Sequence, residues 1–207
     1  EIVEITPTSQ RWNIGAVAFQ IGASFLRRSS VVERSRPVMR NLMMQTGETA
    51  NLGIENSNFV IFVSQVETHE SIRAFFPPGT QSPMHASGIG KALLSHYNSD
   101  RIERLFKSHV LESFTDKTII DKEVLLKELS KIRSQGFSFD DEEKTLGMRC
   151  IAAPILNFFG EAVAGISVSG PTHRMTLERI EPISKLVCQA AANLSVNLGA
   201  SPSRSDK

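Results

Sequence analysis

Residues 149–169 read RCIAAPILNFFGEAVAGISVS, and this stretch indicates the fold more clearly than any other part of the chain. Two runs of mainly apolar and β-branched residues, Arg149–Leu156 and Ala162–Ser169, flank the turn-forming sequence Asn157–Gly160. Strand-like runs joined by a short turn that contains glycine are typical of an antiparallel β-hairpin. We therefore expect these residues to form two neighbouring strands of a sheet.

The register of this hairpin decides which polar side chains share a face. A turn with two central residues pairs Asn157 with Gly160 and places Cys150 opposite Ser167. Ser169 shares that face because side chains alternate along a strand. A thiol and hydroxyls would then line one polar patch, or they would simply fill a tight space between the sheet and a helix. A shift of one residue would break the patch apart.

The rest of the chain alternates between strand and helix patterns. β-Branched and apolar runs predict further strands at Glu1–Ile5, from Arg11, and at Thr49–Ile54, Phe59–Val66, Ile72–Phe76 and Phe137–Asp140. Apolar residues at helical spacing predict helices at Ile14–Leu26, Val31–Gln45, from Ser87, and at Asp100–Ser108, Asp121–Gln135 and Thr176–Leu198. The strands come in hairpins with helices at intervals, which predicts an α+β fold with a mostly antiparallel sheet.

Turn-forming residues, a glycine and a proline set several element boundaries. Thr6–Gln10 and Asn56–Asn58 each lie between two expected strands and carry good turn chemistry. Gly136 is expected to end the helix before it. Pro37 is expected to break or kink the second helix, because proline removes a hydrogen bond from the helix interior.

The composition is that of an ordinary globular protein, since 41% of the 207 residues are hydrophobic and 22% are charged. The formal net charge of +1 lacks the basic excess that a free-standing DNA-binding domain usually carries. No apolar run approaches the roughly 20 residues of a membrane span, and the first residues do not resemble a signal peptide. Cys150 and Cys188 lie in apolar surroundings, as reduced cytosolic thiols often do. We expect a cytoplasmic protein that contacts no membrane.

The segment Met84–Lys91, with the sequence MHASGIGK, is a candidate anion site. Ser87 is a suitable N-cap, and glycines in the first turn of the helix leave backbone N–H groups open to an anion. The segment is not a P-loop, because His85 stands where that motif requires glycine and Ala92 replaces its Ser or Thr. Glycines at a helix start also serve close packing, so both interpretations stay open.

The run Asp140–Glu143 places carboxylates at the end of an expected strand. Most such runs are solvated turns, although paired carboxylates can serve acid–base chemistry. No second acidic cluster supports that chemistry. The histidines show no zinc-type spacing with the cysteines, and they are His69, His85, His96, His109 and His173. We therefore expect no metal and no cofactor.

Four motifs together carry a resemblance to a known family. They read MHASGIGKALL from Met84, GFSFDDEE from Gly136, GMRCIAAP from Gly147 and ISVSGP from Ile166. In this order they resemble the effector domain of the isocitrate lyase regulator (IclR) family of bacterial transcriptional regulators. The likeness extends over about residues 11–199.

The resemblance implies an architecture. The family joins an N-terminal winged helix-turn-helix, through a linker helix, to a C-terminal domain that is similar to the GAF sensor fold. Residues 1–30 would then be a remnant of the wing and the linker helix, 31–199 the effector-binding domain, and 200–207 a disordered tail. The helix-turn-helix is absent from these residues, so operator DNA would be bound only through that missing part. A homodimer or a dimer of dimers is implied, and Phe19, Phe25 and Phe76 are apolar residues without an obvious partner in a monomer.

The resemblance also implies a binding site. In the glyoxylate- and pyruvate-sensing members, the ligand lies at the positions matching Gly88, Ile89, Asp140, Cys150, Ser167 and Ser169. Backbone N–H groups would bind the carboxylate, and the serines would donate to it. The aspartate would accept from a ligand hydroxyl or would itself be protonated, because two bare carboxylates repel each other.

The wall of this site departs from the pattern of those members. They have bulky Leu and Met where this chain has Ser71, Ala74, Ser82 and Met148. Smaller and more polar residues leave room for a larger or more hydroxylated acid.

The resemblance predicts a ligand-sensing domain, not an enzyme, in which a small 2-oxo or 2-hydroxy carboxylic acid controls operator binding. Two alternatives stay open. One is an enzyme that processes a small acid, either a hydrolase with Cys150 as nucleophile or a keto-acid lyase. The other is a GAF-like interaction module that senses nothing, in which the residues from Gly88 to Ser169 only pack.

Overall fold

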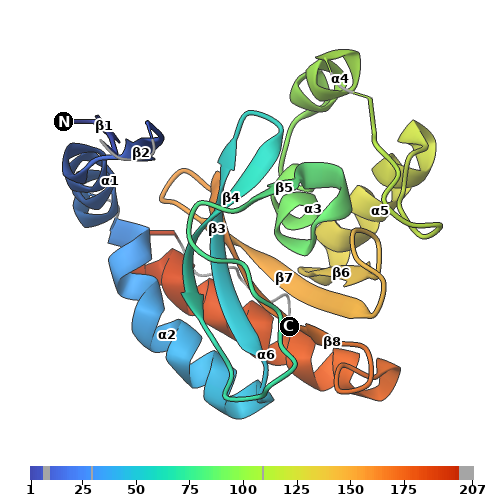
Figure 1. The fold of residues 1–207 in the computed structure, drawn as a ribbon. Coiled ribbons are helices and arrows are strands. Elements are labelled where there is room, and N and C mark those ends of the chain that lie inside the picture. The colour runs from blue at the N-terminus through green and yellow to red at the C-terminus, as the bar shows by residue number, and fades with distance from the viewer. Residues whose placement is uncertain (7–9, 29, 109, 201–207) are drawn as a thin grey trace.

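The structure is a computed structural model that describes residues 1–6, 10–28, 30–108 and 110–200 (Figure 1). The expected turn residues 7–9, His109 and residues 201–207 of the expected tail lie outside the described residues. The described strands form a two-stranded hairpin and one six-stranded sheet with the order β5-β4-β3-β8-β7-β6. Every neighbouring pair in that sheet is antiparallel. The expected α+β class is therefore confirmed.

The elements follow the predicted order closely. The strands are β1 Val3–Ile5, β2 Trp12–Ile14, β3 Thr49–Asn56, β4 Phe59–Val66, β5 Gln81–Pro83, β6 Ser138–Asp141, β7 Met148–Leu156 and β8 Ala162–Pro171. The helices are α1 Ala16–Arg28, α2 Ser30–Thr46, the short 3-10 turn η1 Met84–Ala86, α3 Gly88–Leu94, α4 Ser99–Ser108, α5 Lys122–Gln135 and α6 Leu177–Asn197. None of the described helices is long and apolar enough to cross a bilayer.

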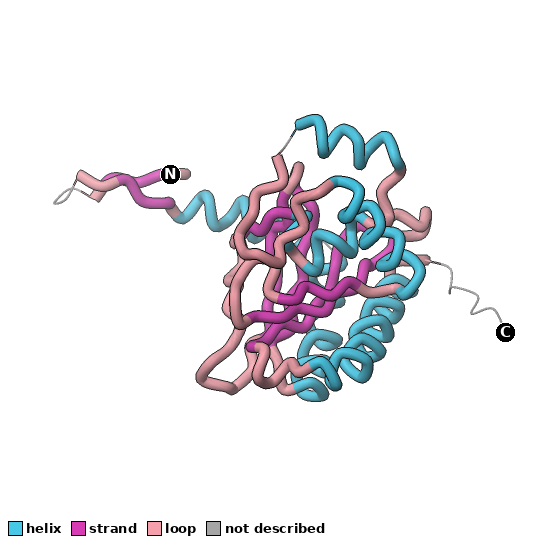
Figure 2. The backbone as a smooth tube through the Cα atoms, turned by 90° about the vertical axis from the view of Figure 1, so that its right-hand side faces the viewer, coloured by secondary structure: helices cyan, strands magenta, loops and turns pink. Residues whose placement is uncertain are grey.

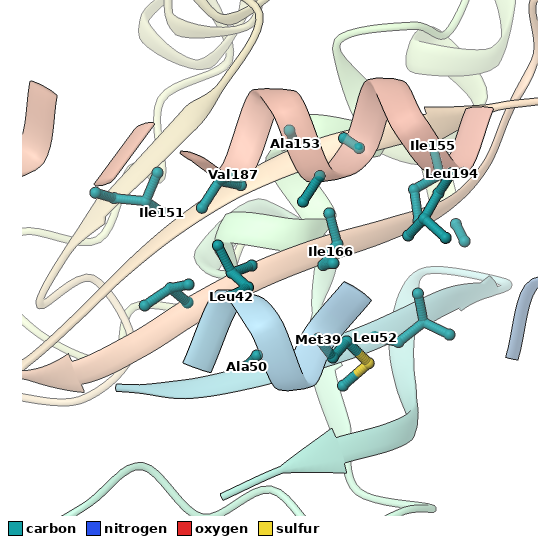
Figure 3. Packing of buried hydrophobic residues seen from close by; sticks show 14 of the residues in the cluster. Met39, Leu42, Ala50, Leu52, Ile151, Ala153, Ile155, Ile166, Val187 and Leu194 are labelled. Carbon is teal, nitrogen blue, oxygen red and sulfur yellow. The ribbon is translucent and has the colours of Figure 1, made fainter. Parts of the chain in front are cut away.

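Helices cover both faces of the large sheet. On one face α2 and α6 pack on β3, β7 and β8, with Met39, Leu52, Ile166 and Val187 in the core between them (Figure 3). On the other face α3, α4 and α5 bury a second cluster that includes Ile89. Strand alternation divides the side chains between these two layers. The polar residues of the predicted site all belong to the α3 face.

The N-terminal segment extends away from this sheet domain. Figure 2 shows the hairpin of β1 and β2, followed by α1, reaching out on one side of it. Ile14 pairs with Val3 in the hairpin and is therefore not part of the helix, which begins at Ala16. Trp12 and Phe19 are exposed. The hairpin buries little apolar surface of its own.

One predicted strand is wrong. Ile72–Phe76 forms no ladder with any described strand, and the outer strand beside β4 is β5 instead. The chain bends at Ser71 and Ile72 instead. Pro77 and Pro78 then follow, and proline cannot donate to a ladder. Residues Ile72–Phe76 therefore form no strand, although their residue types favour one.

Of the break or kink expected at Pro37, the break is absent, because α2 runs through this residue as one helix. Pro37 is exposed, whereas Ser35 and Met39 beside it are buried against the sheet. The buried face holds the helix together across the missing hydrogen bond. Gly136 ends α5 with a φ of 83°, as predicted for a C′ glycine.

The register of the β7–β8 hairpin differs from the prediction by two residues. Asn157 pairs with Glu161 rather than with Gly160, and Gly160 adopts a φ of 76° in the resulting three-residue loop. A bulge between Ile155 and Leu156 adds a second residue. Cys150 therefore lies opposite Ser169, not Ser167. Because the two shifts sum to an even number, the thiol and the hydroxyls still share one face.

Candidate ligand-binding site

A cavity of about 40 Å³ lies on the α3 face of the sheet. Its wall combines residues from the sheet, from the start of α3 and from the loop between β6 and β7. The lining residues are Phe62, Phe76, Ser82, Ala86, Ser87, Gly88, Asp140, Lys144, Thr145, Met148, Arg149, Cys150 and Ser169. Four of the six predicted effector-binding residues line this cavity, and they are Gly88, Asp140, Cys150 and Ser169. Ser82 and Met148 from the predicted wall line it as well.

The floor of the cavity is a polar patch on three neighbouring strands. Cys150 and Ser169 are directly paired across β7 and β8, and Ser167 follows two residues along β8. Asn51 lies opposite Ser167 on β3. Its side-chain amide donates to the hydroxyl oxygens of Ser167 at 3.4 Å and of Ser169 at 3.3 Å. Ser167 is fully buried behind the lining residues and does not itself line the cavity.

The start of α3 forms one side of the cavity. Ser87 is the N-cap, and its hydroxyl oxygen accepts from the N–H of Gly90 at 3.3 Å. A Cβ added at Gly88 would lie 2.7 Å from the sulfur of Cys150, so only glycine lets the helix approach the thiol this closely. The side chain of Ile89 fills the space above Gly165 instead. Ile89 can therefore offer the cavity its backbone only.

Asp140 also lines the cavity. It is paired with Cys150 across β6 and β7, and its carboxylate accepts from the N–H of Glu143 at 2.9 Å. Burial raises the pKa of Asp140 to about 6, although the positive charge of Lys91 opposes this shift. Burial likewise raises the pKa of the Cys150 thiol to about 12. The cavity thus holds a neutral thiol beside a carboxyl group that titrates near neutrality.

The acidic run is only partly the solvated turn that its sequence suggests. Glu143 is buried and forms an ion pair with the fully buried ammonium of Lys91, which also donates to the carbonyl oxygen of Phe139 at 2.8 Å. Burial raises the pKa of Glu143 to about 7. By contrast, Asp141 and Glu142 pair with the exposed ammonium of Lys117. The run therefore anchors the loop after β6 to α3.

The rim of the cavity was not predicted in full. Lys144 donates to the hydroxyl of Ser82 at 2.9 Å and to the carbonyl oxygen of Gln81 at 3.3 Å. Strands β5 and β6 are the two outer strands of the sheet. The contact therefore links the loop that follows β6 to β5 at the opposite edge of the sheet. The rings of Phe62 and Phe76 stack at 4.8 Å and form the apolar wall. Phe76 therefore has a partner within the monomer, contrary to expectation.

Two of the four expected wall residues do not line the cavity. Ser82 and Met148 line it, but Ser71 is exposed and Ala74 is buried elsewhere. Phe76, two residues after Ala74, lines the cavity in its place. Lys144 and Asn51 were missed by sequence reasoning. The signal for Asn51 was a polar residue inside an otherwise apolar strand.

A second hollow, of about 310 Å³, lies between α4 and α5. It is larger than the cavity, but it contains none of the predicted site residues. The guanidinium of Arg133 on its wall is already bound to the carbonyl oxygens of Ser95 and Tyr97. Among the residues that the structure describes, no three His, Cys, Asp or Glu side chains gather as metal ligands.

An antiparallel sheet with helices on both faces and a small polar cavity under one helix defines a small-molecule-binding domain. The family model described as "Bacterial transcriptional regulator IclR C-terminal" matches residues 23–196. The chain therefore belongs to the IclR family of bacterial transcriptional regulators, and it corresponds to their effector-binding domain. This confirms the resemblance that the four motifs carry.

Named relatives and solved structures agree with this family. The HTH-type transcriptional regulator BhcR of Paracoccus denitrificans is 53% identical over 197 residues, which cover 95% of this chain and 71% of that protein. The HTH-type transcriptional repressor AllR of Escherichia coli K12 is 37% identical over 188 residues, which cover 91% and 69%. Thermotoga maritima IclR superposes with a TM-score of 0.85 at 29% identity, over 96% of this chain and 80% of that one. The C-terminal domain of E. coli KdgR gives a TM-score of 0.73 at 30% identity, over 82% and 98%.

Proposed function

We propose that the cavity under α3 binds a small 2-oxo or 2-hydroxy carboxylic acid as the effector of the regulator. One observation carries this proposal: Asp140, Cys150 and Ser169 form a single row across three neighbouring strands. The backbone of Gly88 faces the thiol at the centre of this row. Hydrogen-bond donors and one acceptor thus converge on a space whose wall also contains apolar side chains, and these are Phe62, Phe76, Ala86 and Met148.

Each group in the row suits a different part of such an acid. The N–H groups of Gly88 and Ile89 and the hydroxyl of Ser169 would donate to the carboxylate. Asp140 would accept from the hydroxyl, or would donate to a keto oxygen as the protonated acid. The pKa of Asp140, raised to about 6 by burial, supports the second role toward pH 6 and below, and a bound carboxylate would raise it further. Ser167 and Asn51 would hold the Ser169 hydroxyl in place from behind.

The size of the cavity favours the smaller acids of this class. An ordered water needs on the order of 10–15 Å³ of such space, so about 40 Å³ holds about three or four water-sized groups. This matches an acid of glyoxylate or pyruvate size. A somewhat larger acid would have to displace the Phe76 ring or the Lys144 side chain, because Ser71 and Ala74 add no room.

In the whole regulator, the bound acid would control operator binding through an N-terminal helix-turn-helix. This part would lie in the portion of the relatives beyond the match, since the alignment covers 71% of BhcR and 69% of AllR. Residues 1–30 would then belong to the wing and linker helix, 31–199 to the effector domain and 200–207 to a tail. The name of AllR as a repressor favours the same role here, in the cytoplasm.

The protein would act as a homodimer or a dimer of dimers. Apolar side chains on the N-terminal hairpin and α1 stay exposed in the monomer, and they are Trp12, Ile14, Phe19, Ile21 and Phe25. Exposed apolar groups that cluster in this way mark interaction surfaces. Analytical ultracentrifugation at micromolar concentration tests this, because a clean monomer would contradict it.

An enzymatic role finds less support in the site. The Cys150 thiol interacts with the hydroxyls of Ser169 and Ser167 rather than with a base, and its raised pKa keeps it protonated. A nucleophilic cysteine needs the opposite shift. We therefore propose a sensor rather than a hydrolase or lyase.

Thermal-shift measurements with glyoxylate, pyruvate, glycolate and lactate test the proposed function. An acid present at 100 times its Kd stabilises the fold by about 2.7 kcal/mol, which raises the melting temperature measurably. Analysis of the same samples for products separates a sensor from an enzyme. If none of the four acids shifts the melting temperature, the site is packing and the proposed function fails.

A further inference from the structure

Lys144 places a positive charge on the rim of the cavity without an ion-pair partner of its own. Its ammonium donates to two neutral oxygens, the hydroxyl of Ser82 at 2.9 Å and the carbonyl of Gln81 at 3.3 Å. No carboxylate among the described residues forms an ion pair with it. A half-buried ammonium in this state is available to an anion that enters the cavity.

The other cations around the site are already neutralised. Arg149 also lines the cavity, but its guanidinium donates to the carboxylate of Asp141 at 2.6 Å and to the carbonyl oxygen of Met175 at 2.9 Å. Lys91 is buried in its ion pair with Glu143. Within the described part of the chain, Lys144 is thus the lining cation that is left for a ligand.

An acid in this cavity needs such a cation. Its carboxylate would lie near the carboxyl group of Asp140, and two like charges in a partly buried space repel strongly. Moving an ion out of water also costs several kcal/mol unless it is paired. Burial lowers the pKa of Lys144, whereas the nearby charge of Asp140 favours its charged form. The ammonium and the acid would therefore each relieve the desolvation cost of the other.

We propose that Lys144 is the counter-cation of the effector and makes the site select a carboxylate over a neutral molecule of the same shape. This role rests on the proposed function, and it assigns to Lys144 the recognition of the negative charge of the acid. A lysine suits this role because its flexible stem lets the ammonium turn from Ser82 to the ligand. The hydrogen bond to β5 holds it at the entrance until then.

Pairs of probes with nearly the same shape test this role, in which a neutral amide replaces the charged carboxylate. Isothermal titration calorimetry would compare pyruvate with pyruvamide and lactate with lactamide on the parent protein, on Lys144→Met and on Lys144→Arg. Lys185→Met is the matched control, because Lys185 forms an exposed pair with Glu181 on α6 far from the cavity. Circular dichroism and melting curves would establish that each variant is folded.

The expected result is a loss of about 10- to 100-fold in affinity for the acids in Lys144→Met, as for other hydrogen bonds to charged groups. The amides should keep their weak affinity in that variant, Lys144→Arg should restore binding of the acids, and Lys185→Met should behave as the parent. Equal weakening of acids and amides, or no weakening, would overturn the inference while leaving the proposed function intact. If the parent binds neither acid, both fail together.

Discussion

Asp140 lies directly opposite Cys150 in the β6–β7 ladder. Since Cys150 lies opposite Ser169 in the next ladder, one row across the sheet holds a carboxyl group, a thiol and a hydroxyl. Helix α3 reaches this row through Gly88, whose missing side chain leaves room for the sulfur. The site is therefore built by sheet register and by one glycine, which makes it sensitive to small changes.

Ser169→Ala should weaken binding of the tightest acid of the panel by about tenfold or more, because a hydrogen bond to a charged group contributes about 1.5–3 kcal/mol. Ser167→Ala should weaken binding less, since Ser167 lies behind the lining residues and is bonded to Asn51. Calorimetric titration of the two variants measures both effects. A larger loss for Ser167→Ala would mean that the acid binds deeper than this cavity.

Binding of the acid should tighten as the pH falls from 8 toward 6. The pKa of Asp140 is about 6 in the free protein, and a bound carboxylate would raise it further. The complex then takes up a proton, so a lower pH favours it until the acid itself becomes protonated near pH 3–4. Glu143, Lys91 and Lys144 also carry charges around this carboxyl group.

Asp140→Asn identifies the titrating group. The amide does not titrate, so the affinity of this variant should vary little between pH 8 and pH 6. Titrations of parent and variant across this range provide the measurement. An unchanged slope in Asp140→Asn would assign the proton to another group, with Glu143 the next candidate because its pKa is about 7.

Gly88→Ala should lower stability by about 1–3 kcal/mol, the usual cost of overpacking, because the new Cβ would lie 2.7 Å from the sulfur of Cys150. It should also abolish acid binding. Gly22→Ala is the matched control, since a Cβ there meets nothing within 4 Å in a helix and should be neutral or stabilising. Chemical denaturation measures the stability of both variants. If Gly88→Ala is as stable as the parent and still binds, the close approach of α3 is not required.

Lys91→Met should destabilise the protein by about 3–5 kcal/mol at pH 8, because it leaves the Glu143 carboxylate buried without its cation. The folded-state pKa of Glu143 is already raised and would rise further, so protonation favours the folded state as the pH falls. The loss should therefore be smaller at pH 5.5. Lys91→Met with Glu143→Leu should recover part of it. Equal destabilisation at both pH values would show that packing, not charge, is responsible.

Much of this site could be predicted from the sequence, and the failures have physical causes. Strand alternation placed Cys150, Ser167 and Ser169 on one face even though the predicted pairing was wrong. Loop length and a bulge each shifted the register by one residue, and neither is visible in a hydrophobic pattern. Had only one of them occurred, the thiol and the hydroxyls would have faced opposite sides.

The sequence pattern could not predict contacts between segments that are far apart in the chain. Lys144 reaches Ser82 across the sheet only because the two outer strands approach each other, which no local signal encodes. The burial of Glu143 depends in the same way on Lys91 in α3, 52 residues earlier in the chain. These long-range contacts form the rim and the support of the cavity.

A structure of the complex with the acid that gives the largest thermal shift would locate the binding site itself. We expect this acid in the cavity under α3, with its carboxylate on the N–H of Gly88 and the hydroxyl of Ser169 and its second oxygen facing Asp140. Finding the acid in the hollow between α4 and α5, or on the surface, would show that the proposed site is wrong.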